Sequence, residues 1–172
     1  MTVHSGSAPA SAEDAIDELY RAHALGLVRF AVMLTGDRVT AEDVVQEAFI
    51  GLYRRWDRIR DHASVLPYLR TAVVNGARSA HRSRKRAGLL RLPAEPPAWS
   101  AEAAALDGED RRAVHAAVSR LPRRQREVLA LKYYLDLAEH EIAAILRVSR
   151  GTVSTTAARA LASLSKQLKE ES

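Results

Sequence analysis

The chain has 172 residues, of which 47% are hydrophobic and 27% charged, and its formal net charge is +5. This balance excludes a wholly disordered chain, the absence of cysteine excludes disulfides and thiolate metal sites, and no apolar run is long enough to span a membrane. Aromatic residues are few, whereas alanine, leucine, arginine and glutamate are abundant. We therefore predict an all-α protein of the cytoplasm, with no signal peptide and a polyanionic partner.

Two helices are predicted after a short tail. Residues 1–10 are small and polar, which predicts a flexible tail. Ser11, with Asp14 three positions later, resembles a helix N-cap and capping pair, and apolar residues then recur at helical spacing until Gly36 ends the first helix. Thr40 is the next predicted cap, so we expect a second helix over residues 41–56.

A third helix is predicted to start at Ser64 and to end near Arg86. Its expected buried stripe consists of Leu66, Leu69, Val73 and Ala80. Residues 88–104 then contain three prolines and little periodicity, which is typical of a linker. Residues 11–87 and 105–172 are therefore predicted to form two small helical domains joined by this Pro-rich linker.

The C-terminal half predicts four helices, over residues 106–119, 123–134, 138–146 and 150–168. Ser149 is well placed to cap the last helix. A short helix, a three-residue turn and a longer helix form the outline of a helix-turn-helix, although a plain αα-hairpin has the same periodicity. The apolar face of the last helix is expected to pack on Ile142, Ile145 and Leu146, and it consists of Val153, Ala157, Ala160, Leu161 and Leu164.

The second helix has a polar face opposite its apolar one. Placed at helical spacing, the residues of this face are Asp43, Gln46, Glu47, Ile50 and Arg54. A solvated surface, with Asp43 completing a capping pair with Thr40, is one interpretation. Ile50 favours a protein contact instead, because burying it would contribute roughly 2 kcal/mol.

The third helix carries a polar stripe on its non-core side, at steps of three and four residues. The stripe consists of Tyr68, Thr71, Asn75, Arg78 and Arg82. A stacking aromatic followed by hydrogen-bonding side chains and arginines suits a single-stranded or flipped nucleotide, although such a stripe can also be ordinary surface. From Arg78 to Arg91, both included, there are six basic residues and no acid, which favours nucleic acid.

In a helix-turn-helix, the N-terminal part of the last helix enters the major groove of DNA. Small hydroxylated residues there permit close approach to bases, while arginine holds phosphate. The predicted DNA contacts are Arg150, Thr152, Ser154, Thr155 and Arg159.

No residue pattern indicates catalysis, a metal or a cofactor. The six histidines are scattered, and His140-Glu141 lacks the second histidine of a zinc-protease helix. There is no glycine-rich phosphate loop, and no carboxylate pair faces a plausible nucleophile. We therefore predict a protein that is not an enzyme.

Several motifs carry a resemblance to a known family. Residues 40–49 (TAEDVVQEAF) resemble the region 2 signature of extracytoplasmic-function (ECF) sigma factors, within the sigma-70 family. Residues 121–128 (LPRRQREV) resemble the opening of region 4 in the same proteins, and Glu141-Ile142-Ala143 with residues 149–153 resemble its helix-turn-helix. The order of these motifs also agrees, so the resemblance covers about residues 12–168.

The resemblance implies a subunit that gives core RNA polymerase its promoter specificity. It implies that Asp43, Gln46 and Glu47 dock on the coiled coil of the largest polymerase subunit. It also implies that the third helix, with residues 61–66, holds the melted non-template strand of the minus ten element, and that the last helix reads the duplex minus thirty-five element. It leaves open whether an anti-sigma factor also binds the chain.

The chain departs from the family pattern at two places. Arg147 replaces the glycine common in the turn of the helix-turn-helix, which implies either a different turn or a strained residue. Ser154-Thr155-Thr156 stand where the family often has basic residues, so the promoter sequence cannot be carried over and phosphate anchoring is expected to be weaker.

Two other functions fit the residues without the resemblance. A stand-alone helix-turn-helix transcriptional regulator would bind a palindromic operator without polymerase. A helical adaptor that does not bind DNA would keep its activity when Arg78, Arg82 and Arg159 are replaced by alanine.

Overall fold

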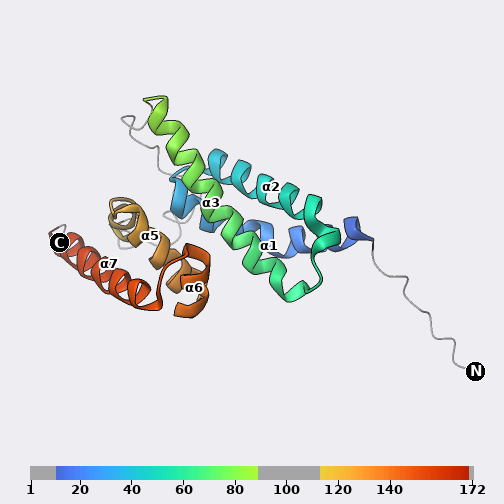
Figure 1. The fold of residues 1–172 in the computed structure, drawn as a ribbon. Coiled ribbons are helices and arrows are strands. Elements are labelled where there is room, and N and C mark those ends of the chain that lie inside the picture. The colour runs from blue at the N-terminus through green and yellow to red at the C-terminus, as the bar shows by residue number, and fades with distance from the viewer. Residues whose placement is uncertain (1–10, 89–112, 171–172) are drawn as a thin grey trace, which may run out of the picture.

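The computed structural model describes residues 11–88 and 113–170, and within these ranges every regular element is a helix (Figure 1). This agrees with the predicted all-α class. The tail predicted for residues 1–10, nearly all of the linker predicted for residues 88–104 and the start of the helix predicted for 106–119 lie outside the described residues. No helix in the described ranges has the length and apolar character needed to cross a membrane.

Three long helices pack pairwise to form the N-terminal unit. They are α1 (Ala12–Thr35), α2 (Arg38–Arg55) and α3 (Val65–Arg86). Two short 3₁₀ turns, η1 (Trp56–Arg58) and η2 (His62–Ser64), connect α2 to α3. The third helix starts and ends within a residue of the prediction.

The ends of α1 are set by local hydrogen bonds. The Ser11 hydroxyl oxygen accepts from the Asp14 backbone N–H at 3.1 Å, and the Asp14 carboxylate accepts from the Ser11 N–H at 3.2 Å. This reciprocal pair is a capping box, as predicted. Gly36 ends the helix in the left-handed region with φ of 84°, where glycine has no steric cost.

The prediction that Thr40 caps α2 is wrong. The helix begins three residues earlier than expected, because the Asp37 carboxylate accepts from the Thr40 backbone N–H at 2.8 Å. Asp37 has the extended backbone of an N-cap, and aspartate caps helices at least as well as threonine. The Thr40 hydroxyl oxygen instead accepts a hydrogen bond from Arg84, at 2.8 Å.

The C-terminal unit contains a described helical segment over residues 113–119 and three further helices. These are α5 (Arg123–Leu129), α6 (Glu139–Leu146) and α7 (Arg150–Glu170). A π-helical turn, η4 (Ala130–Tyr134), continues α5, and the Leu135 N–H donates to the Ala130 carbonyl at 3.1 Å. The predicted helix over 123–134 therefore has the right extent but a widened last turn.

The helices α6 and α7 form the predicted helix-turn-helix. Arg147 adopts the left-handed conformation, with φ of 54° and ψ of 51°, so the turn keeps the geometry that suits glycine. The Ser149 hydroxyl oxygen accepts from the Thr152 N–H at 3.0 Å and caps α7 as predicted. Val153, Ala157 and Ala160 are buried on the inner face.

Leu161 was predicted on that inner face, but it is 45% exposed. Consecutive helical residues point about 100° apart, and Ala160 takes the inward direction at this turn. The α6 helix is only eight residues long, so it covers the first turns of α7 and not this one. Leu164 is partly buried, in a small cluster with Leu121 and Leu129.

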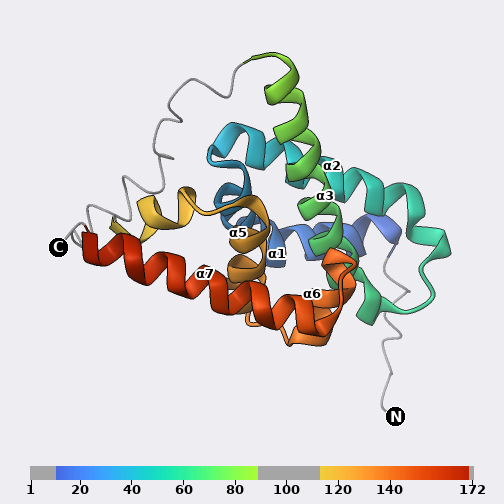
Figure 2. The same cartoon turned by 60° about the vertical axis from the view of Figure 1, so that its left-hand side comes forward.

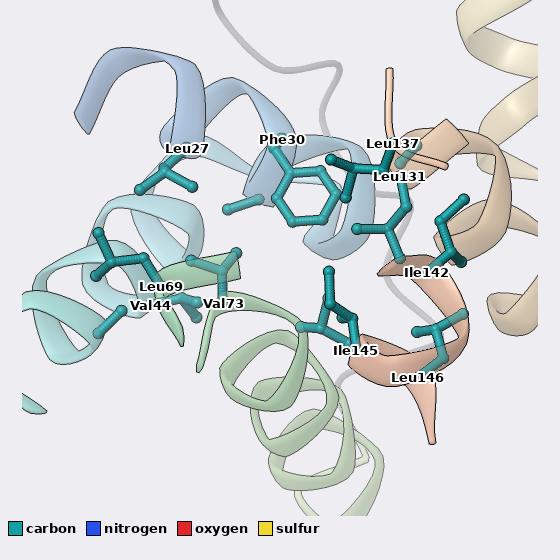
Figure 3. Packing of buried hydrophobic residues seen from close by; sticks show 14 of the residues in the cluster. Leu27, Phe30, Val44, Leu69, Val73, Leu131, Leu137, Ile142, Ile145 and Leu146 are labelled. Carbon is teal, nitrogen blue, oxygen red and sulfur yellow. The ribbon is translucent and has the colours of Figure 1, made fainter. Parts of the chain in front are cut away.

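The two helical units pack against each other in a single hydrophobic cluster. Helix α1 contacts α5 and η4, α3 contacts α6, and α7 lies on the outer side of α5 and α6 (Figures 1 and 2). In the cluster, Leu131, Leu137 and Ile145 of the C-terminal unit face Phe30 and Val73 of the N-terminal unit (Figure 3). The N-terminal and C-terminal units therefore share one core.

The left-handed turn at Arg147 generates a stability prediction. A non-glycine residue in this conformation costs about 1–2 kcal/mol, and the Arg147 side chain is exposed. We expect Arg147→Gly to raise the free energy of unfolding by about 1 kcal/mol in urea denaturation. Arg159→Gly is the matched control, because it removes an exposed arginine from helical backbone and should lower stability by about 1 kcal/mol. Equal effects of the two changes would contradict the strain at residue 147.

Candidate nucleic-acid and protein interfaces

The outward face of α2 is exposed to solvent. Asp43, Gln46 and Glu47 are exposed, and Ile50 is 41% exposed. The opposite face of the helix, which includes Val45 and Leu52, is buried. Since Asp37 caps α2, the interpretation that Asp43 serves a Thr40 cap no longer applies. The face combines acids with an exposed isoleucine.

The polar stripe of α3 is only partly exposed. Asn75 and Arg82 are exposed, whereas Tyr68 and Thr71 are half-buried. A methyl group added at Gly51 would lie 2.8 Å from the Tyr68 hydroxyl oxygen, so the absence of a side chain there makes room for the ring. The Arg55 guanidinium lies 5.8 Å from the centre of the Tyr68 ring. Tyr68 therefore packs against α2 at Gly51 and Arg55.

Arg78, in the same stripe, is bound to the C-terminal unit. Its Nε and Nη2 donate to the two carboxylate oxygens of Glu127, at 2.7 and 2.8 Å. The side chains are 18% and 2% exposed. The hydrogen bonds that Arg78 donates to Glu127 raise the pKa of Arg78, against the effect of burial. Glu127 was not among the predicted site residues, because no local pattern links it to a residue 49 positions earlier.

The basic end of α3 is anchored to the start of α2. Arg84 donates to the Asp37 carboxylate and to the Thr40 hydroxyl. Burial raises the pKa of Asp37, but hydrogen bonds from Thr40 and Arg84 outweigh it, so the pKa lies below its usual value. Arg82, Lys85 and Arg86 stay exposed around this anchored residue. The run of cations beyond Arg78 is therefore mostly open to solvent.

The outer face of α7 is exposed at every predicted DNA-contact position. These positions are Arg150, Thr152, Ser154, Thr155 and Arg159. Gly151 is also exposed, while Val153 is fully buried against the rest of the C-terminal unit. The N-terminal turns of α7 thus offer hydroxyl groups and backbone at the surface, with an arginine two turns later.

The connection between α2 and α3 is ordered by its own side chains. The Asp61 carboxylate accepts from the Ala63 N–H at 3.0 Å, and the Ser64 hydroxyl donates to the Asp61 carbonyl at 2.6 Å. The rings of Trp56 and His62 meet edge to face, with centroids 5.4 Å apart. Within the described ranges, no group of three or more histidines or carboxylates could hold a metal ion.

Comparison with protein families matches both units of the chain. The family model for sigma-70 region 2 matches residues 19–87, and that for sigma-70 region 4 matches residues 111–164. These ranges contain the α2 and α3 faces and the helix-turn-helix, respectively. The chain is thus a protein of the sigma-70 class.

Curated relatives specify the branch of this class. The chain is 34% identical over 153 residues to the RNA polymerase sigma-E factor of Streptomyces avermitilis, covering 88% of this chain and 84% of that protein. It is 32% identical over 172 residues to the ECF RNA polymerase sigma factor SigL of Mycobacterium tuberculosis, covering 95% of each. The chain belongs to the ECF sigma factors, which bind core RNA polymerase and promoter DNA and direct transcription initiation.

Solved structures show the same fold at lower identity. The sigma factor RpoE of Bartonella quintana, in complex with the anti-sigma factor NepR, has a TM-score of 0.73 and 22% identity, covering 90% of this chain and 97% of that one. CnrH, in complex with the cytosolic domain of CnrY, has a TM-score of 0.69 and 24% identity, covering 93% and 91%.

The Asp37 carboxylate generates a pH-dependent prediction. Its pKa is lowered in the folded protein, so its contribution to stability is full above the unfolded pKa of about 3.9 and is lost as pH falls through the folded value. Asp37→Asn keeps a good cap but removes the charge facing Arg84. We expect a loss of about 1 kcal/mol at about pH 7, limited by partial solvent exposure, and little difference at about pH 3.

Chemical denaturation at both pH values measures this effect. Glu42→Gln serves as the control, because it removes an exposed ion pair with Arg38 and should change stability by less than about 0.5 kcal/mol. If the loss caused by Asp37→Asn persisted at acid pH, the carboxylate charge would not be its source.

Proposed function

We propose that three exposed helical faces of this sigma factor bind polymerase, the minus ten element and the minus thirty-five element, respectively. Region 2 comprises residues 11–87, region 4 comprises residues 105–172, and residues 88–104 link them. The proposal is supported by one observation: three surfaces of different chemistry lie on α2, α3 and α7, outside the shared core. The chain itself catalyses no reaction in this proposal and acts in the cytoplasm, where its polymerase works.

The outward face of α2 is the proposed docking surface for polymerase. Asp43, Gln46 and Glu47 would pair with basic and polar groups on the coiled coil of the largest subunit, while Ile50 would be buried on binding. Burial of Ile50, which is 41% exposed in the free chain, would add roughly 1–2 kcal/mol. Acids around an apolar residue suit a protein surface better than a nucleic acid.

The stripe on α3 and the loop of residues 61–66 are the proposed site for the minus ten element. Tyr68 would stack on an unpaired base, while Thr71 and Asn75 would hydrogen-bond to bases or sugar. Arg78 and Arg82 would hold phosphates of the displaced non-template strand. Tyr68 is half-buried and packs against α2 at Gly51 and Arg55, so stacking on a base would cost it less side-chain freedom than a fully exposed ring.

The exposed face of α7 is the proposed reader of the minus thirty-five element. Thr152, Ser154 and Thr155 would approach base edges in the major groove, and Arg150 and Arg159 would contact phosphates. Residues 154–156 carry hydroxyl groups at positions where the family often has basic side chains. We therefore propose that this region binds phosphate weakly and depends on polymerase for stable binding to DNA.

A transcription assay tests the proposed function. Core polymerase is mixed with the purified chain and fragmented genomic DNA, and the 5′ ends of the transcripts are sequenced. We expect defined start sites preceded by shared minus ten and minus thirty-five sequences. Operator binding by the chain alone, with no defined start sites in the presence of polymerase, would instead indicate a stand-alone regulator.

The docking surface generates a charge-reversal prediction. Asp43→Arg combined with Glu47→Arg should abolish co-purification with core polymerase, because both side chains are exposed and would then repel a basic partner. The free energy of unfolding should change by less than about 1 kcal/mol. Glu13→Arg with Asp17→Arg is the matched control, since it reverses two exposed acids at the same spacing on α1. Retained polymerase binding by a folded α2 variant would refute the docking surface.

The recognition helix generates a salt-dependence prediction. Arg159→Ala should weaken promoter binding by the holoenzyme for all sequences alike and reduce the slope of log affinity against log salt by about 1, as expected for one lost phosphate contact. Lys166→Ala, farther along the same exposed helix, should leave the slope unchanged. An altered base preference with an unchanged slope would mean that Arg159 reads a base.

A protein inhibitor is a further proposed partner. The solved relatives RpoE and CnrH are in complex with NepR and with the cytosolic domain of CnrY. We propose that this chain also binds an anti-sigma factor, and co-purification from native cells tests this directly. Recovery of polymerase with no second stoichiometric protein, in cells grown without stress, would count against it.

A further inference from the structure

Helices α2 and α3 lie side by side and approach each other closely at two glycines (Figure 1). A methyl group added at Gly76 of α3 would lie 2.8 Å from Cγ1 of Val44 on α2. At the second contact, a methyl group added at Gly51 of α2 would lie 2.8 Å from the Tyr68 hydroxyl oxygen on α3. Each helix thus contributes one glycine, and a side chain at either position would displace its neighbour.

The contact at Gly76 fixes the spacing of the two helices. Glycine is a poor helix former, so its place in the interior of α3 calls for a packing reason. Val44 is buried, and a β-branched side chain has little freedom to turn away. Ordinary contacts begin near 3.4 Å, so a methyl group at residue 76 would force the helices apart by about 0.6 Å.

Each glycine contact lies beside residues of two proposed binding surfaces. On α2, the residue before each contact belongs to the polymerase-docking surface, and on α3 the contact includes or adjoins a residue of the single-strand stripe. These residues are Asp43 and Ile50 on α2, and Asn75 and Tyr68 on α3. The distance between the docking surface and the stripe is therefore set where the glycines lie.

A holoenzyme has to use both surfaces at once. When polymerase holds the outward face of α2, the place of the α3 stripe relative to polymerase depends on how α3 packs on α2. Binding groups have to be held within about 0.5 Å of their productive geometry. A separation of about 0.6 Å at Gly76 exceeds this tolerance, but it leaves the docking residues of α2 in place on their own helix.

We propose that Gly76 and Gly51 are positioning residues, which set the distance between the polymerase-docking surface of α2 and the single-strand stripe of α3. The inference rests on the proposed function of these two surfaces. Each glycine acts through the side chain that it allows to approach, which is Val44 in one case and Tyr68 in the other. A side chain at either glycine separates the two activities: polymerase docking is kept and binding of the minus ten strand is weakened.

Two affinities of the reconstituted holoenzyme test this inference. The first is the affinity of the full chain for core polymerase. The second is the affinity of the holoenzyme for a fluorescent single-stranded oligonucleotide that carries the minus ten sequence found upstream of the transcript start sites. We expect Gly76→Ala to leave the first unchanged and to weaken the second about tenfold, because a misplacement of about 1 Å can cost about a hundredfold.

A compensating substitution distinguishes positioning from general loss of stability. Val44→Ala removes both Cγ atoms, and the Cβ atom that remains lies 3.6 Å from a methyl group at residue 76, which is an ordinary contact. The double variant Val44→Ala with Gly76→Ala should therefore recover the oligonucleotide affinity. Val44→Ala alone should lower stability, since it leaves a cavity, without changing that affinity.

Gly26→Ala is the matched control. It makes the same substitution in the interior of α1, where nothing lies within 4 Å of an added methyl group. Both affinities should stay at the wild-type value. Circular dichroism checks that each variant keeps its helices. If Gly76→Ala does not fold, Gly51→Ala takes its place, because only the far end of the Tyr68 side chain has to move, and the same loss of oligonucleotide binding is expected.

A folded Gly76→Ala chain that binds the oligonucleotide as tightly as the wild type would overturn the positioning role, as would an equally tight Gly51→Ala chain where that variant is used. Failure of the double variant to recover would show that the contact with Val44 is not the cause. If the wild-type holoenzyme itself did not bind the oligonucleotide, the proposed minus ten site would be refuted, and the positioning role with it. The wild-type reference thus distinguishes the two failures.

Discussion

The buried carboxylate of Glu127 is the interaction on which the arrangement of this sigma factor depends. A charge at 2% exposure costs several kcal/mol unless it is paired, and the two hydrogen bonds from Arg78 supply that pairing across the seam between the regions. Apolar residues of both regions, such as Phe30 and Leu131, pack in one hydrophobic cluster elsewhere between the regions (Figure 3). Helices from distant parts of the chain are thereby held at a fixed distance.

The faces proposed for function lie around this seam rather than within it. The α2 face and the α7 face are exposed, so the contact between the regions covers neither of them. The α3 stripe differs, because it includes the exposed Asn75 and Arg82 and also the half-buried Arg78, which is bound to Glu127. A single helix therefore serves both the packing between the regions and the proposed contact with the displaced DNA strand, and these two uses compete for one arginine.

The helix-turn-helix shows how a fold tolerates a departure from its family pattern. Arg147 takes the left-handed conformation that glycine usually provides, and its side chain points to solvent. The turn is kept because Ser149 caps α7 and because Val153 and Ala157 bury the inner face of that helix. Packing over two helices outweighs a local cost of about 1–2 kcal/mol. Exposed positions of the outer face, such as Ser154 and Thr155, take no part in this packing.

The sequence by itself determined what depends on near neighbours. The Ser11 and Ser149 caps and the stop at Gly36 involve residues within four positions, so local rules predicted them correctly. Family membership also followed from short motifs. The α2 cap was predicted at Thr40 because the hydroxyl is a good cap, but that hydroxyl binds Arg84, which lies 44 residues later. The ion pair between Arg78 and Glu127, which are 49 residues apart, was decided only by tertiary packing. No local sequence pattern predicts that α3 will contact α5.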